Sequence, residues 1–463
     1  MKDELAARLA PYDQQHLLAF WDRLDAEQQA SLAAQIRAID FELIRRLYQR
    51  RDSRDDLRPL LARTAPPPAF RLDTTQNPFT PEQARRRGHQ ALDAGEVGAV
   101  LVAGGQGTRL DFPQPKGLFP IGPVSGKTLF QIHVEKVIAR ARRHGVRIPL
   151  YVMTSPATHE ETAVFLAAHD RFGLPPDELR VFCQGSMPAV DAATGGLLLE
   201  SPGRIATSPD GHGGLLEAAA RNGVLDDLRR RGIRQLFYLQ VDNPLVDICG
   251  PEFIGYHLLA GSELSSQVVA KRDPLERLGN VIEADGKTMV IEYSDLPDDV
   301  ARRLSADGSL TIWAGSIAVH VIDVALLRRL SEASHGLPFH IARKRVAHID
   351  STGRQIEPSD LNAIKFERFI FDLIPLARNP IVVEVDRRSA FAPIKNASGA
   401  KEDTPESAQG LLTALHRSWL RRAGAEVGDE VPVEISPLMA LDAEELAAKL
   451  PRGTRITQPT YLA

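Results

Sequence analysis

Three features of the sequence predict an α/β fold in which helices cover both faces of a mainly parallel sheet. Apolar runs of strand length alternate with segments of helical periodicity between residues 97 and 241. Polar loops begin directly where several of these apolar runs end. The 463 residues are 43% hydrophobic and 25% charged, which is ordinary for a globular chain large enough to hold more than one domain.

Residues 1–75 are expected to form a helical N-terminal layer. Apolar residues recur at helical spacing in two stripes, from Leu17 to Leu24 and from Leu32 to Leu47. These stripes predict two successive amphipathic helices. Three prolines at positions 66–68 are typical of a stiff linker and are expected to end the layer.

Residues 76–408 are expected to form the catalytic domain, which opens with a helix capped by Thr80 and started by Pro81. The expected strands are 97–103, 148–154, 179–184, 236–241 and 381–385, and the expected helices are 128–144, 156–169, 216–231 and 366–373. Strands 281–283 and 289–293 are expected to form a hairpin around the turn sequence 284–287. The polar segment 397–405 is expected to be a mobile loop.

Residues 409–463 are expected to form a small C-terminal α+β module. Its predicted elements are a strand at 431–435 and a helix at 442–450.

The loop after the first apolar run is the most informative feature of the chain. It carries Gly104, Gly105 and Gly107, and glycine lets backbone N–H groups turn outward while a bulky anion approaches closely. Arg109 and Lys116 place two positive charges beside those amides. A strand, a glycine loop and two flanking cations together predict a seat for a polyphosphate group.

Two common phosphate-binding motifs do not fit the spacing. The dinucleotide fingerprint, counted from Gly105, would need a third glycine at the position of Leu110. The segment from Gly122 to Thr128 resembles a P-loop, but three residues separate its glycines where four are required. Lys127 and Thr128 are instead expected to open the following helix.

Further polar residues follow the ends of other expected strands, so they are expected at the same edge of the sheet. Gln184 offers a donor and an acceptor that suit a nucleobase edge, although a surface-loop glutamine is the commoner role. The loop 208–214 has three glycines whose amides could meet a base or ribose, and a simple surface turn fits equally. Asp242 is suited to bind a Mg²⁺ ion that also contacts phosphate. The alternative is that Asp242, Asn243 and Pro244 only form a turn and bind no ligand. Lys395 ends an apolar segment, where a lysine is usually a solvated charge.

Composition excludes several classes of function. The formal net charge is -4 and arginines are interspersed with acids, so no nucleic-acid partner is expected. Cys183 and Cys249 lack metal-ligand spacing and are expected to be reduced, buried thiols, and the histidines show no zinc-site spacing. No apolar run has membrane-spanning length and no signal-peptide pattern is present, so we expect no membrane partner and a cytoplasmic location.

Taken together, these segments resemble the eukaryotic-type UDP-N-acetylhexosamine pyrophosphorylases, within the wider UDP-sugar pyrophosphorylase family. The resemblance extends from about His16 to Trp419. Its ordered motifs are HLLAFWDRL, LVAGGQGTRL, PKG, KTLFQ, QG, DGHGG, VDN, IEYS, IKFE and KN. The resemblance implies a nucleotide-diphospho-sugar transferase fold, a Rossmann-like twisted mixed sheet flanked by helices. It also implies a uridylyltransferase that converts UTP and a sugar 1-phosphate into UDP-sugar and pyrophosphate with Mg²⁺.

The resemblance also implies roles for individual residues. It assigns the uridine moiety to Gly104, Gly105, Gln184 and Gly213. It assigns the triphosphate to Arg109 and Lys116 and the metal to Asp242. It assigns the sugar hydroxyls to Glu292. The phosphates of the sugar phosphate and of the product are assigned to Lys365 and Lys395. Arg109, Lys116 and Lys395 are therefore the expected catalytic residues.

One segment departs from the family pattern. Members specific for N-acetylhexosamines carry asparagines in the segment that matches residues 313–320, where this chain has Trp313, Ser316 and Val319. The family places the sugar near this segment, so Ser316 is a candidate substrate-binding residue. A serine is shorter than asparagine and does not bridge two sugar groups as an amide does. The resemblance as a whole favours N-acetylglucosamine 1-phosphate, with UDP-glucose or broad UDP-sugar synthesis as the alternative.

Two functions of other kinds are weighed against the transferase. A non-catalytic sensor of UDP-sugar is disfavoured, because a sensor does not need the full charge set of Arg109, Lys116, Asp242 and Lys395. A glycosyltransferase of related fold needs an Asp-x-Asp metal pair, which the sequence does not supply around Asp242.

Overall fold

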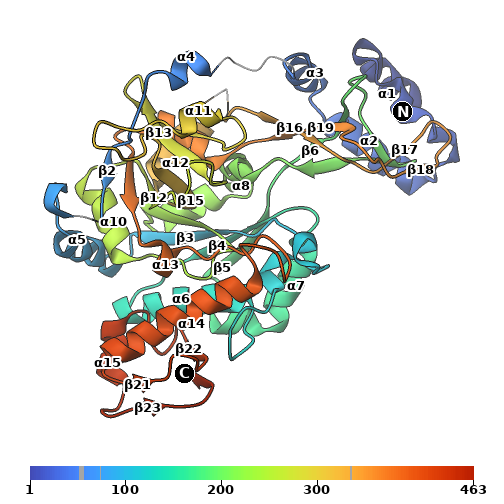
Figure 1. Ribbon diagram of the computed structural model, residues 1–463. Helices are drawn as coiled ribbons and strands as arrows, with labels where there is room; N and C mark the ends of the chain where they lie inside the picture. The colour runs from blue at the N-terminus through green and yellow to red at the C-terminus, as the bar shows by residue number, and fades with distance from the viewer. Residues whose placement is uncertain (52–56, 73, 334–335) are drawn as a thin grey trace. The chain divides into compact units, whose positions relative to one another are not determined.

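The computed structural model describes residues 1–51, 57–72, 74–333 and 336–463 (Figure 1). Contacts between residues group the chain into two compact units. The first unit comprises Met1–Leu57, Gln184–Gly214 and Leu337–Ile370. The second comprises Arg58–Cys183, Leu215–Gly336 and Phe371–Ala463. The division into three consecutive parts that the sequence suggests stays a prediction.

The second unit is built on an eleven-stranded mixed sheet. Four parallel strands form one part of it, namely β11 (Gln235–Gln240), β3 (Val97–Val102), β4 (Leu150–Thr154) and β5 (Leu179–Cys183), in that spatial order. Beyond β11 the order continues through β15 (Ala314–Asp323), β12 (Leu264–Ala270), β20 (Ile381–Glu384) and β2 (Ala69–Phe70). The strand β15 runs antiparallel to β11 and to β12. The predicted α/β class is confirmed, and each expected strand of the parallel part is found within two residues of its predicted bounds.

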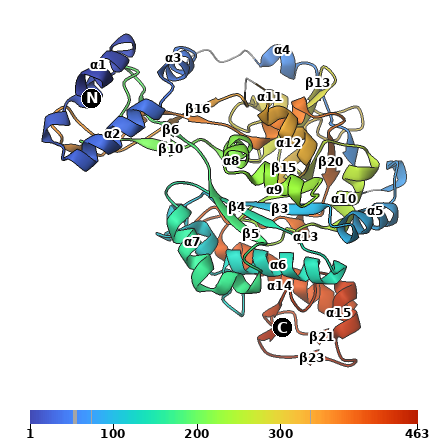
Figure 2. The ribbon, with the colours of Figure 1, turned by 180° about the vertical axis from the view of Figure 1, so that it is seen from behind.

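Helices cover both faces of this sheet (Figures 1 and 2). One layer contains α5 (Pro81–Asp93), α6 (Leu129–His144), α7 (His159–Ala168), α10 (Pro251–Leu259) and α14 (Pro405–Arg422). Their apolar residues share a core with Ala99 and Leu101 of β3. The other layer contains α8 (Leu215–Arg221), α9 (Val224–Arg230) and α12 (Val324–Ser331). A Cβ placed on Gly98 would meet Leu228 of α9, so alternate residues of β3 face opposite layers.

Of two helix predictions in this unit, one is confirmed and the other is wrong. The capped helix at Thr80 is confirmed, since the Thr80 hydroxyl and the Gln83 side chain form the reciprocal capping pair. The single helix expected at 216–231 is wrong, because the chain forms α8 and α9 with a break between them. Gly223 has φ +66° at that break, a left-handed conformation that ends one helix and that glycine adopts without strain.

The predicted hairpin is confirmed as β13 (Gly279–Ala284) and β14 (Lys287–Ile291). Asp285 and Gly286 both have positive φ, at 51° and 74°, which is the turn that matches the twist of two antiparallel strands. β13 also pairs with β15 and with β1 (Thr64–Ala65). The remaining short helices of this region are α4 (Arg58–Leu61), α11 (Asp298–Ala301) and α13 (Arg387–Ala390).

The helix expected at 366–373 is also wrong. Residues Ala363–Glu367 form the strand β19, and Ile370–Leu376 form a 3-10 turn. The strand pairs along its whole length with β16 (His340–Lys344), which outweighs the helical spacing of its apolar residues. Lys365 consequently lies on a strand.

The first unit contains α1 (Lys2–Leu9), α2 (Ala26–Ala38) and α3 (Phe41–Gln49) packed on short strands. The stripe from Leu17 to Leu24 is not one helix but two 3-10 turns, Gln15–Leu18 and Trp21–Arg23. The second stripe is interrupted, because Asp40 caps a new helix by accepting a hydrogen bond from the Leu43 N–H. The strands here are β6 (Ser186–Pro188), β7 (Val190–Asp191), β8 (Leu199–Ser201), β9 (Arg204–Ile205), β10 (Thr207–Pro209), β16, β17 (His348–Ile349), β18 (Gln355–Ile356) and β19.

After α14, the chain forms the short strands β21 (Glu426–Val427), β22 (Val433–Ile435), β23 (Arg455–Ile456) and β24 (Thr460–Leu462), with α15 (Ala443–Lys449) between them. These elements have a small apolar core of their own that includes Leu420, Ile435 and Leu446. The predicted strand and helix of this region are both present, each slightly shorter than expected.

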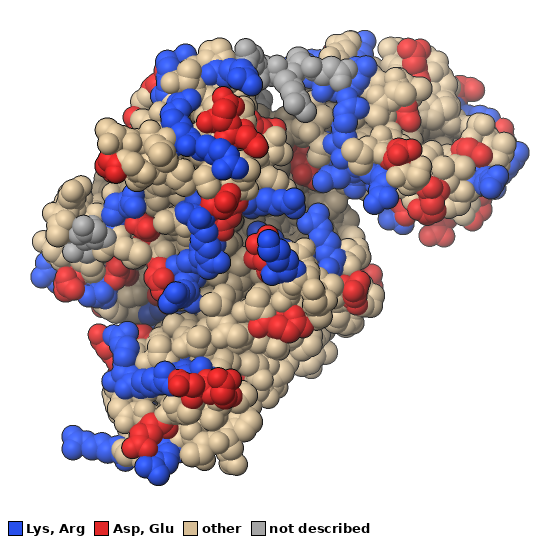
Figure 3. Space-filling model, in the orientation of Figure 1, with Lys and Arg blue, Asp and Glu red and all other residues tan. Residues whose placement is uncertain are grey.

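On the face shown in Figure 3, Lys and Arg side chains are interspersed with Asp and Glu side chains. Within the described part of the chain, no helix has both the length and the apolar composition needed to cross a membrane.

Candidate functional site

The glycine loop after β3 doubles back on itself. The Gly107 N–H donates to the Gln114 carbonyl at 2.9 Å, and the Lys116 N–H donates to the Gly105 carbonyl at 3.1 Å. These two hydrogen bonds bring Lys116 back beside the glycines that precede it. The predicted phosphate seat and its second cation are therefore adjacent in space.

The glycines of this loop serve different purposes. A Cβ on Gly107 would lie 2.7 Å from the Phe112 ring and from the Phe112 carbonyl oxygen, so the fold of the loop itself needs glycine there. A Cβ on Gly105 would meet nothing within 4 Å, and Gly105 is exposed. The open side of the loop at Gly105 is thus the place where a ligand can approach the backbone.

Lys116 connects three segments that are far apart in the sequence. Its Nζ lies 3.9 Å from Oδ2 of Asp242, which follows β11, and donates to the Ile394 carbonyl at 3.2 Å. The Ile394 N–H in turn donates to the Asp242 carbonyl at 3.0 Å. The two charged side chains are only 16% and 15% exposed, so their charges are weakly screened by water. Three of the segments singled out in the sequence therefore meet at one place.

Lys395 directly follows this contact. Its N–H and that of Asn396 both donate to the Asp403 carbonyl, at 2.8 and 3.0 Å, which folds the segment 395–403 into a closed loop. Burial raises the pKa of the Asp403 carboxyl, and the positive charge of Lys395 opposes that shift, whereas the negative charge of Asp242 adds to it. The segment from 397 to 404 contains no helix or strand, and α14 begins at Pro405.

Asn243, for which the sequence indicates no role beyond its place in a turn and in the VDN motif, connects two segments of the site. Its Nδ2 donates to the Ala390 carbonyl at 2.8 Å, and its Oδ1 accepts from the Ala392 N–H at 3.0 Å. The side chain is buried, and both of its polar ends are used. Asn243 thereby fixes the segment that leads to Lys395 against the segment that carries Asp242. An asparagine directly after a strand-end aspartate was the available signal.

Arg109 lies in the 3-10 turn Thr108–Leu110, and its side chain is exposed. No contact recorded among residues 74–333 or 336–463 joins Arg109 to Asp242 or Lys395. Its role stays a prediction that rests on the glycine loop alone.

Glu292 and Ser316 lie beside the same glycine. Gly279 of β13 pairs with Ser316 of β15. A Cβ on Gly279 would lie 3.8 Å from the Ser316 Cβ and 3.9 Å from the Glu292 Oε1. The structure therefore brings together the two residues expected to contact the sugar.

Trp313 and Val319, which occupy the other two positions where the family has asparagines, lie in the core. Trp313 is 7% exposed and Val319 is 1% exposed. The Arg71 guanidinium lies 3.6 Å from the centre of the Trp313 ring. Ser316 is thus the half-exposed member of the three positions where asparagines were expected.

The backbone is strained next to Ser316. Ser266 of β12 pairs with His320 and Val268 pairs with Ser316, so one residue of β12 opposes three residues of β15. Within this bulge Ala318 has φ +55°, and its N–H donates to the Ser316 hydroxyl at 3.3 Å. Alanine rarely adopts a left-handed conformation, and such strain is concentrated at functional sites.

The first unit contains Gln184 and Gly213. The Gln184 amide nitrogen donates to Asp210 Oδ1 and to the Gly211 carbonyl, each at 3.0 Å, so its carbonyl oxygen is the part suited to a ligand. The Gly213 N–H donates to the Arg368 carbonyl at 2.8 Å, and a Cβ there would lie 2.6 Å from that carbonyl carbon. Close packing therefore explains the glycine at 213.

Lys365 lies in the same unit on β19, three residues before Arg368. The side chain is half-buried, and this burial lowers the pKa of its ammonium, with the nearby Lys344 adding to the effect and Glu367 opposing it. A partly desolvated ammonium interacts strongly with an anion, which is consistent with its predicted role.

Within the described residues, no group of three or more His, Cys, Asp and Glu side chains is arranged to hold a metal by itself. Asp242 nevertheless offers carboxylate oxygens in a half-buried position, with the charge of Asp403 nearby. Mg²⁺ is commonly held by one or two carboxylates together with water and substrate phosphates. These residues fit a magnesium ion shared with a bound phosphate.

Comparisons with known proteins identify relatives along most of the chain. The model of the UTP–glucose-1-phosphate uridylyltransferase family matches residues 63–448. A UDP-N-acetylglucosamine pyrophosphorylase of Saccharomyces cerevisiae is 40% identical over 370 residues, which are 78% of this chain and 77% of the yeast protein. The UDP-N-acetylhexosamine pyrophosphorylase-like protein 1 of Homo sapiens is 35% identical over 494 residues, 100% of this chain and 97% of the human one. The crystal structure of the uridine diphosphate N-acetylglucosamine pyrophosphorylase of Trypanosoma brucei superposes with a TM-score of 0.82 at 28% identity, covering 97% of this chain and 95% of that chain.

Proposed function

We propose, from the premise that this chain belongs to the UTP–glucose-1-phosphate uridylyltransferase family, that it forms UDP-N-acetylglucosamine and pyrophosphate from UTP and N-acetylglucosamine 1-phosphate. The chain is a UTP:sugar-1-phosphate uridylyltransferase. The proposal concerns its sugar, its metal and the residues that act.

The observation that carries the proposal is the position of Lys116. Its backbone N–H binds Gly105 of the open glycine loop, and its ammonium lies within 3.9 Å of Asp242. The Ile394 carbonyl that the ammonium binds immediately precedes Lys395. Two cations and one carboxylate at a glycine loop suit a polyphosphate that shares a metal ion with the protein.

The chemistry requires charge neutralisation above all. A phosphate oxygen of the sugar phosphate attacks the α-phosphorus of UTP, the bond to the β-phosphate oxygen breaks, and pyrophosphate leaves. Both reactants are anions, so the protein must overcome their repulsion and align them. We assign Lys116 and Arg109 to the triphosphate and Lys395 to the developing charge on the transferred and leaving phosphates. No covalent protein nucleophile is needed in this scheme.

The remaining substrate contacts keep the assignments that the resemblance implies. We assign the uridine moiety to Gly104, Gly105, Gln184 and Gly213. In the second unit, Glu292 and Ser316 are assigned to the sugar. In the first unit, Lys365 is assigned to the phosphate of the sugar phosphate.

We propose Mg²⁺ as the cofactor, held by Asp242. When bound, it supplies positive charge that polarises the phosphate oxygens and helps to orient them. The carboxylate of Asp242 is suited to hold it because its side chain is only 15% exposed, so its charge is weakly screened by water.

The choice of sugar rests on similarity along the chain rather than on residues 313–320. The yeast relative that is 40% identical is named a UDP-N-acetylglucosamine pyrophosphorylase. Ser316, with Glu292 beside it, leaves a hydroxyl where the family pattern has an amide, so the alternative is a broader acceptance of UDP-sugars.

The test is a panel of sugar 1-phosphates incubated with UTP, with pyrophosphate release as the measurement. N-acetylglucosamine, glucose and galactose 1-phosphates are each assayed with Mg²⁺ and with EDTA. We expect the highest kcat/KM for N-acetylglucosamine 1-phosphate and no turnover with EDTA. A preference for glucose 1-phosphate would overturn the proposed sugar, and UDP-sugar binding with no pyrophosphate release from any member would favour a sensor.

A further inference from the structure

One helix holds the segment that carries Asp242 by its backbone carbonyls. The His133 Nε2 lies 3.0 Å from the Val241 carbonyl oxygen, and the Lys136 Nζ donates to the Pro244 and Val246 carbonyls at 2.6 and 2.8 Å. Both side chains belong to α6 and are three residues apart, so they lie on one face of the helix. Their contacts bracket Asp242 on both sides along the chain.

Further hydrogen bonds connect this segment to the residues next to Lys395. Asn243, which lies between the carbonyls held by His133 and Lys136, binds the backbone of Ala390 and Ala392. The Ile394 N–H then donates to the Asp242 carbonyl. A displacement of the segment 241–246 would therefore move the carboxylate of Asp242 and the attachment of Lys395 together.

We propose that Lys136 is a positioning residue for uridylyl transfer, whose ammonium fixes the segment 241–246 and so orients Asp242 and Lys395. The inference rests on the proposed roles of these two residues. Lys136 itself touches neither substrate nor metal in this scheme. It acts through backbone carbonyls, and a methionine side chain of similar length has no N–H with which to hold either of them.

Placing the ammonium of Lys136 at this position costs free energy, which supports a role for Lys136 beyond packing. Burial lowers the pKa of Lys136 to about 8, while the charge of Asp247 opposes the shift and that of Arg140 adds to it. An unpaired ammonium in the interior is expensive, and apolar residues of similar volume are often at least as stabilising. The two carbonyls that Lys136 holds lie in the segment that also carries Asp242, so its effect is concentrated on a site residue.

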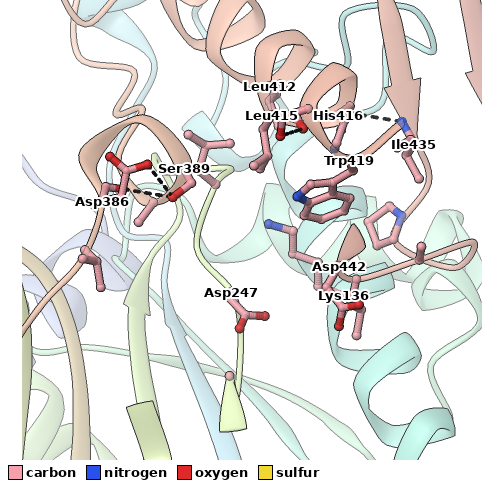
Figure 4. Close-up of a pocket in the computed structure, with 18 of the residues that line it drawn as sticks. Lys136, Asp247, Asp386, Ser389, Leu412, Leu415, His416, Trp419, Ile435 and Asp442 are labelled. Atoms are coloured by element: carbon pink, nitrogen blue, oxygen red, sulfur yellow. Dashed lines mark hydrogen bonds between the residues drawn. The ribbon is translucent and has the colours of Figure 1, made fainter. Parts of the chain in front are cut away.

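Lys136 also lines a cavity of about 590 Å³, shown in Figure 4. The wall opposite α6 is formed by Leu412, His416 and Trp419 of α14. The Lys136 side chain enters this cavity from α6 (Figure 4). Shortening Lys136 would therefore leave room for a small molecule that replaces the missing part of the side chain.

The cavity makes chemical rescue the decisive experiment. In Lys136→Ala the missing atoms correspond to propylamine, which is added to the assay, with propan-1-ol as a control of similar size that lacks an ammonium. We expect kcat to fall about 10- to 100-fold, the range that a misplacement near 1 Å produces, while the KM for UTP changes less. Propylammonium is expected to restore part of kcat, and propan-1-ol is not.

A matched variant and a second readout separate positioning from folding. Lys127→Met removes another partly buried ammonium at the start of the same helix, where it binds Glu135, and is expected to keep kcat. The affinity for Mn²⁺ in the presence of UTP is measured by electron paramagnetic resonance, with Asp242→Asn as the reference for a lost ligand. Lys136→Met and Lys136→Ala are expected to weaken Mn²⁺ binding while retaining the wild-type far-ultraviolet circular dichroism spectrum.

Two outcomes would overturn the inference. One is wild-type kcat and Mn²⁺ affinity in both Lys136 variants, and the other is equal rescue by propylamine and propan-1-ol. If the wild-type protein transfers no uridylyl group to any sugar phosphate, the proposed function fails. The Mn²⁺ measurement with UTP alone then still decides whether Lys136 orients Asp242.

Discussion

At the scale of single residues, a small number of contacts holds each charged side chain of the site in place. Lys116 is fixed by its own N–H, which binds Gly105, and by its Nζ, which binds Ile394 and lies near Asp242. Such an arrangement is pre-organised, because the ammonium does not have to move to meet an incoming phosphate. Pre-organised charge in a partly desolvated site is usually the largest protein contribution to transfer reactions of this kind.

We therefore expect Lys116→Ala and Lys395→Ala to fold normally and to lose most turnover. Removal of one such electrostatic donor costs about 3 kcal/mol of transition-state stabilisation, equivalent to roughly a hundredfold in kcat. Steady-state kinetics of pyrophosphate release measures the loss, and thermal unfolding checks the fold. Lys449→Ala, which removes an exposed lysine of α15, is the control and should keep its activity. Wild-type turnover in both site variants would remove these lysines from the mechanism.

At the scale of elements, the strand β15 does two things at once. Most of its residues are buried, Val319 among them, and Trp313 directly before the strand is buried too. Ser316, which precedes the bulge, pairs with Gly279 and lies near Glu292. The same bulge places Ala318 in a left-handed conformation. The strand therefore places the half-exposed Ser316 beside Glu292 while most of its other residues are buried.

Ser316→Asn is expected to raise the preference for N-acetylglucosamine 1-phosphate over glucose 1-phosphate. An amide adds a donor and an acceptor within reach of the acetamido group, and one additional hydrogen bond is worth about 1 kcal/mol, or roughly fivefold. The ratio of kcat/KM for the two sugars is the measurement. Ser316→Ala, which removes the hydroxyl and adds no amide, should not raise that ratio. An unchanged ratio in Ser316→Asn would place the sugar elsewhere.

At the scale of the whole molecule, buried histidines link stability to pH in both units. Burial lowers the pKa of His133 and of His416 to about 3 in the second unit and that of His212 to about 4 in the first. Each takes part in a specific hydrogen bond; for example, the His416 Nδ1 accepts from the Ile435 N–H at 3.2 Å. Protonation of that nitrogen would remove the acceptor, so the folded protein keeps the ring neutral.

The free energy of unfolding is expected to fall as the pH drops below 6.5. In that range the unfolded chain binds a proton at each of these histidines and the folded chain does not, so acid favours unfolding, and the loss continues to the folded-state pKa near 3 to 4. Each group contributes about 1.4 kcal/mol per pH unit. Urea unfolding between pH 7.5 and 4.5 measures the slope.

A variant of one histidine tests the assignment. His416→Asn retains an acceptor without a proton-binding site, so its unfolding free energy should depend less steeply on pH than that of the wild type. Ser418→Ala, which changes an exposed residue of the same helix that binds no proton in this range, should match the wild-type slope. Identical slopes in His416→Asn and the wild type would show that His416 does not contribute.

The parts of the fold that local chemistry dictates could be predicted from the sequence. The strand and glycine loop at 97–107, the capping pair at Thr80 and the turn at Asp285 each depend on neighbouring residues, and the structure has all three. The errors arose where distant partners decide. Residues 363–367 become a strand because β16 pairs with them, and Gly223 divides a helix whose apolar pattern is continuous.

The candidate site divides in the same way. Glycine, lysine and aspartate at strand ends were recognisable as phosphate and metal chemistry, whereas Asn243 and Lys136 were not, because their roles consist of contacts with backbone more than one hundred residues away. Nothing in the local sequence distinguishes a lysine that holds two carbonyls from one exposed on a helix.

The fold class, the predicted phosphate loop and the family pattern are readable from residues that lie close together along the chain. Tertiary contacts were needed to show that Lys116, Asp242 and Ile394 meet and that Ser316 rather than Trp313 or Val319 lies beside Glu292. They were also needed to show that α6 holds the segment of Asp242. The physical reason is that hydrogen bonds and charge interactions act over a few ångströms of space, and the order of residues along a chain does not fix which distant groups come that close.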